Sequence, residues 1–184
     1  MKNVNLSTVS DGNRKLEPGG YVLVIRNVED HPLDPATGKG DYLSIEYDID
    51  GGDFAGYYEG MFNSLGFWGG RFIRSYKPKA LGMFKGFIKE LKEDNTAFAS
   101  RWKDDAENDE KVMIGCKFGA ILGEEEYRGN DGTIKKRLYV SKIVPINDIV
   151  YGGYAVPKLK TLPDNKPVVG VVDTTEKIAE DAPF

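Results

Sequence analysis

The stretch "IGCKFGAILGEEEYRGNDGTIKKRLYVSKIVPI", residues 114–146, decides the fold class. Residues 114–127 and 134–146 are two runs rich in apolar and β-branched side chains, and "RGNDG" between them is a strong hairpin turn. We therefore predict two antiparallel strands. If Leu138 and Val140 face the core, Arg137 and Tyr139 face outward together, because side chains alternate along a strand.

Three further strands are predicted upstream of this hairpin. Residues 20–30 follow the turn signal "EPGG", and residues 41–49, "DYLSIEYDI", alternate apolar and polar side chains. Residues 57–62, "YYEGMF", are the predicted third strand, and the glycine-interrupted segment after them is expected to be a loop or a broken strand.

One helix is predicted at residues 78–94, between the third and fourth strands. Leu81, Phe84, Phe87 and Leu91 recur at helical spacing, and Pro78 suits a first helical turn, where its missing N–H costs nothing. The order strand, strand, strand, helix, strand, strand is that of a five-stranded OB-fold-like barrel. The fold class is therefore predicted to be mainly β, although small mixed α+β sheets share this order.

Composition bounds the organisation of the chain. With 184 residues, 40% of them hydrophobic and 29% charged, we expect a globular domain at residues 20–160, an extension at 1–19 and a flexible acidic tail at 161–184. No apolar run is long enough to cross a bilayer, and the first residues do not resemble a secretory signal. A single cysteine, which cannot form an internal disulfide, favours a reducing cytoplasm.

Charge is distributed unevenly. The formal net charge is −4, of which −3 lies in residues 161–184, where five acids accompany two bases. A second acidic cluster, "DDAENDE", is confined to one predicted loop at residues 104–110. The rest of the body is therefore positive enough to carry a local basic face.

Signals for catalysis are weak. His31 lies in a predicted loop, Cys116 begins an apolar strand where a buried inert thiol is expected, and no P-loop, GxSxG or HExxH motif occurs. One histidine and one cysteine also exclude a classical zinc site. The acids from Glu124 to Glu126, together with Asp131, remain an alternative Mg²⁺-dependent nuclease site. Neither a metal nor a cofactor is expected.

Aromatic and cationic side chains are interleaved in two places, a pattern typical of binding to single-stranded nucleic acid. One is "FWGGRFIRSYKPK" at residues 67–79, and the other is the hairpin at residues 127–140, which corresponds to a loop that flanks the ligand groove of an OB barrel. The predicted nucleic-acid-binding residues are Arg26, Lys39, Trp68, Arg71, Phe72, Arg74, Tyr76, Lys77, Arg128, Lys135, Lys136, Arg137 and Tyr139. For each aromatic, a place in the core is an equally weighted alternative.

The C-terminal residues "EDAPF" resemble the acidic tip of bacterial single-stranded DNA-binding proteins, in which a proline-containing linker ends in acids, a hydrophobic residue, Pro and Phe. Glu180 and Asp181 match the acids, and Pro183 and Phe184 match the final pair. Ala182 is smaller than the residue usual in that place, and the acidic run is shorter.

Residues 15–160 resemble a different group, the small phage and prophage proteins of Gram-positive replication regions that are thought to bind single-stranded DNA. The resemblance is carried by "RSYKPKALGMFKGFIKELKEDN" and by the hairpin described above. It implies a homo-oligomeric protein, not an enzyme, that coats single-stranded DNA without strong sequence preference during bacteriophage replication or recombination in the cytoplasm of a bacterial host cell. A structural or adaptor role in a virion, without binding to nucleic acid, is an alternative. The resemblance of the tip implies that replication or recombination proteins bind there, and no membrane is expected as a partner.

Overall fold

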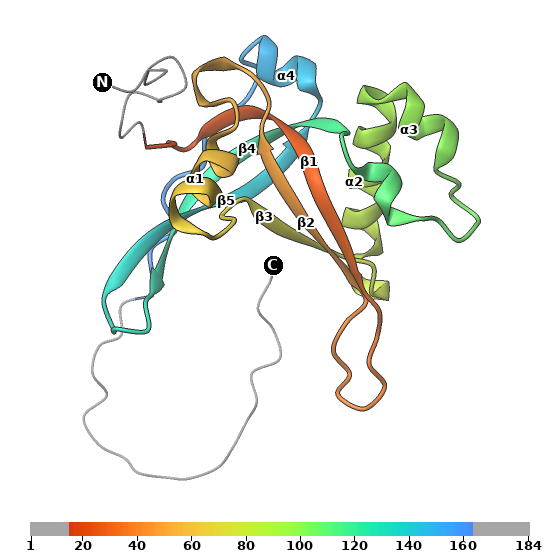
Figure 1. Cartoon of the computed structure of the whole chain (residues 1–184), viewed down its shortest axis with the longest axis horizontal. Helices are drawn as coiled ribbons and strands as arrows, with labels where there is room; N and C mark the ends of the chain where they lie inside the picture. The colour runs from red at the N-terminus through yellow and green to blue at the C-terminus, as the bar shows by residue number, and fades with distance from the viewer. Residues whose placement is uncertain (1–14, 164–184) are drawn as a thin grey trace, which may run out of the picture.

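The computed structural model describes residues 15–163 (Figure 1). The chain forms a mainly β fold with one five-stranded antiparallel sheet in the order β3-β2-β1-β4-β5. The strands are β1 (Gly19–His31), β2 (Tyr42–Ile49), β3 (Arg71–Ser75), β4 (Lys117–Arg128) and β5 (Ile134–Val144). The helices are α1 (Tyr57–Leu65), α2 (Leu81–Asp94), α3 (Thr96–Arg101) and α4 (Ile146–Val150), and 3-10 turns lie at Gly52–Phe54, Pro78–Ala80 and Glu110–Met113.

Four of the predicted strands and the predicted helix are confirmed. The strands β1, β2, β4 and β5 differ from the expected ranges by a few residues at their ends. The helix predicted at residues 78–94 forms as a 3-10 turn with Pro78 at its start, followed directly by α2. The hairpin turn also forms, since the Gly129 N–H donates to the carbonyl oxygen of Thr133 at 2.8 Å.

The prediction for the third strand was wrong. Residues 57–62 belong to α1, and β3 lies later, inside the segment expected to be a loop or a broken strand. The helix α1 ends at Gly66, which has a left-handed backbone with φ 77° and donates its N–H to the Phe62 carbonyl. Residues 95–113, for which no helix or strand was predicted, contain α3 and a 3-10 turn.

The sheet is open rather than closed into a barrel. β3 and β5 are its two edge strands, and within residues 15–163 no backbone ladder joins them. The two edges nevertheless approach each other, with Cα atoms within 8 Å. The expectation of a closed five-stranded barrel is therefore not met, although the number of strands is as predicted.

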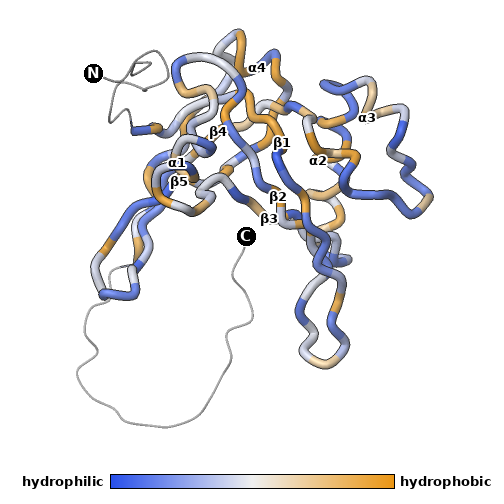
Figure 2. Tube along the Cα trace, in the orientation of Figure 1, coloured by the Kyte–Doolittle hydropathy of each residue, from blue (hydrophilic) through white to orange (hydrophobic). Residues whose placement is uncertain are grey.

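The core fills the inner face of the sheet. Leu43, Ile45, Tyr47 and Ile49 alternate inward along β2 and are buried, as their spacing predicts. Helix α2 covers this face with Phe87, whose ring lies edge-on to aromatic rings of β3 and β4 at centroid distances of 5.7 and 5.8 Å. Figure 2 shows hydrophobic residues in the first part of β1 and a hydrophilic tip on the β4–β5 hairpin, while the tip of the β1–β2 hairpin is close to neutral in hydropathy. No helix in the described part of the chain is long and apolar enough to cross a membrane.

Candidate nucleic-acid interface

The outer face of the sheet is divided into a covered half and an open half. Residues 145–162, here called the C-terminal segment, pack across the outer faces of β1 and β4 at three glycines. A Cβ atom at Gly20 would lie 2.3 Å from the ring of Tyr154, and one at Gly123 would lie 2.9 Å from Pro157 Cγ. Gly119 likewise faces Ile149 Cγ1 at 3.0 Å. These glycines let the segment lie directly on the strands.

The other half of the outer face is formed by the second part of β1 with β2 and β3, and we call it the open face. The strand register fixes its members, because directly paired residues share a face. Arg26 is the exception, since it lies at a β-bulge and is assigned to this face by its contact with Glu59 of α1. Its members are Arg26, Asn27, Glu29, His31, Tyr42, Ser44, Glu46, Arg71, Ile73 and Ser75. Two of the thirteen predicted nucleic-acid-binding residues, Arg26 and Arg71, lie on it.

Both arginines of the open face are exposed and form ion pairs with acids. Arg26, at a β-bulge in β1, lies 3.8 Å from a carboxylate oxygen of Glu59 in α1. Arg71 of β3 pairs with Glu46, which is opposite it in β2. Exposed ion pairs contribute only about 0–1 kcal/mol each, so an incoming anion exchanges with these carboxylates at little cost.

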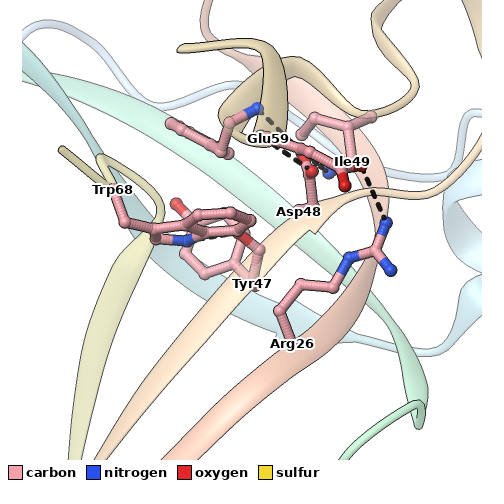
Figure 3. A network of polar contacts seen from close by, with 7 residues as sticks. Arg26, Tyr47, Asp48, Ile49, Glu59 and Trp68 are labelled. Carbon is pink, nitrogen blue, oxygen red and sulfur yellow. Dashed lines mark hydrogen bonds and ion pairs between the residues drawn. The ribbon is translucent and has the colours of Figure 1, made fainter. Parts of the chain in front are cut away.

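The helix α1 closes one end of the open face and is held there by Asp48 (Figure 3). This carboxylate is fully buried, and it accepts hydrogen bonds from the backbone N–H groups of Ile49, Tyr58 and Glu59 at 2.8, 2.9 and 3.1 Å. It therefore satisfies free donors at the helix start, which has no capping side chain of its own. Sequence reasoning missed both Asp48 and α1.

Trp68 follows α1 and is half-buried. Its indole N–H donates to the carbonyl oxygens of Tyr47 and Gly70 at 3.2 and 3.0 Å, and its ring centroid lies 6.2 Å from that of Phe62. Phe62, Leu65 and Phe67 remain exposed beside it. The indole N–H of Trp68 thus holds the ring to the backbone, while part of the ring remains accessible to solvent.

Phe72 and Arg74 lie on the inner face, not on the open face. Phe72 is 9% exposed and packs against Tyr47, Phe87 and Phe118, so the prediction that it stacks on bases is replaced by its core alternative. The guanidinium of Arg74 lies 4.7 Å from the Phe72 ring centroid. Burial lowers the pKa of Arg74 to about 10, which leaves it charged at neutral pH.

Tyr76, Lys77 and Lys39 lie together at the base of the β1–β2 hairpin. The Tyr76 hydroxyl donates to Asp30 at 2.7 Å, and burial, followed by this hydrogen bond, raises the pKa of the Tyr76 phenol. The Lys77 ammonium donates to the Gly38 carbonyl oxygen at 3.4 Å. Within residues 15–163, neither Lys39 nor Lys77 forms an ion pair with an acid, so both are available to phosphates.

The β4–β5 hairpin carries four of the predicted cations, and three of them have acidic partners. Lys135 pairs with Asp131 at 2.9 Å, Lys136 with Glu124 at 3.7 Å, and Arg137 with Glu125 at 2.8 Å. Arg128 instead donates to the Gly132 carbonyl oxygen at 3.1 Å. A hydrogen bond from the Thr133 hydroxyl, followed by one from Lys135, lowers the pKa of Asp131 to about 2.

Tyr139 is on the outer face, as the alternation of β5 predicts, but it is not free. Leu138 and Val140 pack against the core, while the Tyr139 ring has the Lys160 ammonium 4.0 Å from its centroid and Pro157 nearby. The C-terminal segment therefore covers the Tyr139 ring. The prediction that Tyr139 stacks on bases is corrected for this reason.

The acids proposed as an alternative metal site do not converge. Glu124 and Glu126 point to one face of β4 and Glu125 to the other, and Glu126 accepts a hydrogen bond from the Leu162 N–H at 3.1 Å. In the part of the chain that the structure describes, no group of three or more His, Cys, Asp or Glu side chains is placed to hold a metal ion. Cys116 is buried, and burial raises the pKa of its thiol.

The predicted partner-binding residues Glu180, Asp181, Pro183 and Phe184 lie outside the described residues. Compared with known proteins, the chain matches no family model, and no curated protein matches its sequence.

Proposed function

We propose that this protein binds single-stranded DNA across the open face and coats it without strong sequence preference during bacteriophage replication or recombination. The acidic tip would recruit replication or recombination proteins, as the resemblance of the last residues implies. In this proposal the body is an incompletely closed OB-like barrel, in which β3 and β5 approach each other without forming a backbone ladder within residues 15–163.

The observation that carries the proposal is the arrangement of two hairpins around the open face. In Figure 1 the β1–β2 and β4–β5 hairpins both extend toward the bottom of the view. In an OB barrel these are the two loops that flank the groove for oligonucleotides, and strands two and three form its floor. Here that floor is the half of the outer face that the C-terminal segment leaves uncovered.

Charge on this surface supports binding by exchange of ionic partners. Arg26 and Arg71 lie on the floor, Lys39 and Lys77 at one hairpin, and the cations of residues 128–137 at the other. Most of these cations pair with carboxylates that are exposed or half-buried. The surface of the protein without DNA is therefore close to neutral, which suits a net charge of −4. When DNA phosphates replace the carboxylates as partners of these cations, each broken exposed ion pair costs about 0–1 kcal/mol of free energy.

Fluorescence titration of a labelled oligo-dT with the full chain at rising salt tests this function. Affinity should fall steeply as salt rises, without any need for metal, because counterions are released from the strand. In the variant Arg71→Gln, the slope of log K against log salt should shrink by about 0.7, which corresponds to one lost phosphate contact on a single strand.

The matched control is Lys89→Gln on α2. Lys89 is also exposed and also paired with an acid, Glu93, at 3.5 Å, but it does not belong to the open face. Its removal should leave both the affinity and the slope unchanged. Absence of oligo-dT binding by the wild type at low salt would overturn the proposed function.

A further inference from the structure

His31 and Tyr42 form a stacked pair of rings at the end of the open face nearest the β1–β2 hairpin. They are directly opposite each other in β1 and β2, with ring centroids 4.6 Å apart and ring planes 19° from parallel. Both side chains remain half-exposed, so solvent reaches the stack. His31 is the only histidine of the chain, and the structure places it in β1 rather than in the predicted loop.

The backbone around Tyr42 is held firmly. The Asp41 carbonyl oxygen accepts hydrogen bonds from the Ser75 hydroxyl at 3.0 Å and from the Tyr76 N–H at 2.9 Å. The Asp41 carboxylate also accepts from the Leu33 N–H at 3.1 Å. A ring on such a rigid element loses little conformational entropy when a planar ligand stacks on it.

Cations lie close to this stack in the chain and in space. Ser75 is directly opposite Tyr42 in β3, and Lys77 follows two residues later. The Lys77 ammonium contacts the hairpin at Gly38, next to Lys39. A flat aromatic surface beside two cations without acidic partners in the described chain is the combination that binds a base together with its phosphates.

We propose that the His31–Tyr42 pair is a base-stacking platform, on which an unpaired nucleobase lies while Lys39 and Lys77 contact the adjacent phosphates. This inference rests on the proposed function and adds a residue pair that sequence reasoning did not select. The Glu29 carboxylate lies 3.6 Å from His31 Nε2, on the same face of the sheet. If the His31–Tyr42 pair had a structural role only, it would stabilise the sheet by cross-strand packing and would not affect the affinity for bases.

The test compares the affinities of the full chain for oligo-dT and for an abasic oligonucleotide of the same length. The wild type should prefer oligo-dT, and Tyr42→Ala should reduce affinity for oligo-dT by about 5-fold to 150-fold, the range expected for one stacked base. Its affinity for the abasic strand and its salt slope should not change, because no phosphate contact is lost.

Two further variants separate stacking from folding. Tyr42→Phe keeps the ring and should retain the preference for bases, while His31→Ala, at a strand end, should weaken the preference without loss of the fold by circular dichroism. An equal loss on both oligonucleotides in Tyr42→Ala, or no loss on either, would overturn the platform while the proposed function stands. A wild type that binds neither oligonucleotide would overturn the proposed function itself.

Discussion

Replacement of Asp48 by alanine should destabilise the protein by about 3 kcal/mol. The side chain is fully buried and accepts three backbone hydrogen bonds, two of them from the first turn of α1. Loss of a helix cap costs about 1 kcal/mol, and a buried N–H left without an acceptor, here that of Tyr58, costs about 2 kcal/mol more. For a domain of this size the midpoint of thermal unfolding should fall by about 6–12 °C.

Urea and thermal unfolding followed by circular dichroism measure this change. The matched control is Asp50→Ala, which removes the same charge at the end of the same strand. Within the described residues, the Asp50 side chain forms a surface ion pair with Lys117 at 2.8 Å and does not hold a helix. That variant should lose at most about 1 kcal/mol. Asp48→Asn, which keeps one acceptor oxygen, should fall between the two.

A second readout shows whether α1 is the element that loosens. In a Trp102→Phe background, Trp68 is the only tryptophan, and its indole N–H is bonded to backbone next to α1. Asp48→Ala should shift Trp68 emission to the red under native conditions. If Asp48→Ala is no less stable than Asp50→Ala and the emission is unchanged, the reasoning that this carboxylate holds α1 is refuted.

Three shorter predictions concern the core, the hairpin and the thiol. Phe72→Ala should cost about 3–5 kcal/mol in urea unfolding, whereas Arg71→Ala should cost about 1 kcal/mol or less; equal costs would contradict the assignment of Phe72 to the core. The hydrogen bonds that Asp131 accepts should be fully present above its ordinary pKa of 3.8 and should be lost as the pH falls through about 2. The Thr133 amide resonance should therefore titrate near pH 2, and a midpoint near 3.8 would contradict the bonding seen here. Cys116 should react with a thiol reagent at pH 8 only as fast as the protein unfolds, and rapid labelling of the native protein would show that it is accessible.

Local patterns in the sequence were enough to predict β2, α2 and the β4–β5 hairpin. The alternation of β2 places Leu43 and Ile45 in the core, and the hairpin depends on a turn signal that acts within five residues. Helix α1 was missed because its aromatic start favours a strand, and because its capping group, Asp48, lies nine residues earlier, in another element. The glycine at position 66, a common helix terminator, was the signal that would have revealed it.

The candidate site was harder to predict because its exposure depends on contacts distant in sequence. Tyr139 alternates outward as expected, yet Pro157 and Lys160 cover it. Arg71 is on the open face and Phe72 in the core only because of the register of β3 against β2, and that register was unknown while β3 itself was misplaced. The ion pairs of the hairpin cations also follow from strand pairing, and composition cannot show them.

Chemical-shift mapping of backbone amides by NMR, with oligo-dT added to the full chain at low salt, tests the central claim most directly. The amides of β2 and β3, of the β1–β2 hairpin and of the β4–β5 hairpin should shift together, because the bound DNA crosses the open face between the two hairpins. The amides of the covered half, around Gly119 and Ile149, should not move. An unchanged spectrum, or shifts confined to the covered half or to α2 and α3, would contradict the account.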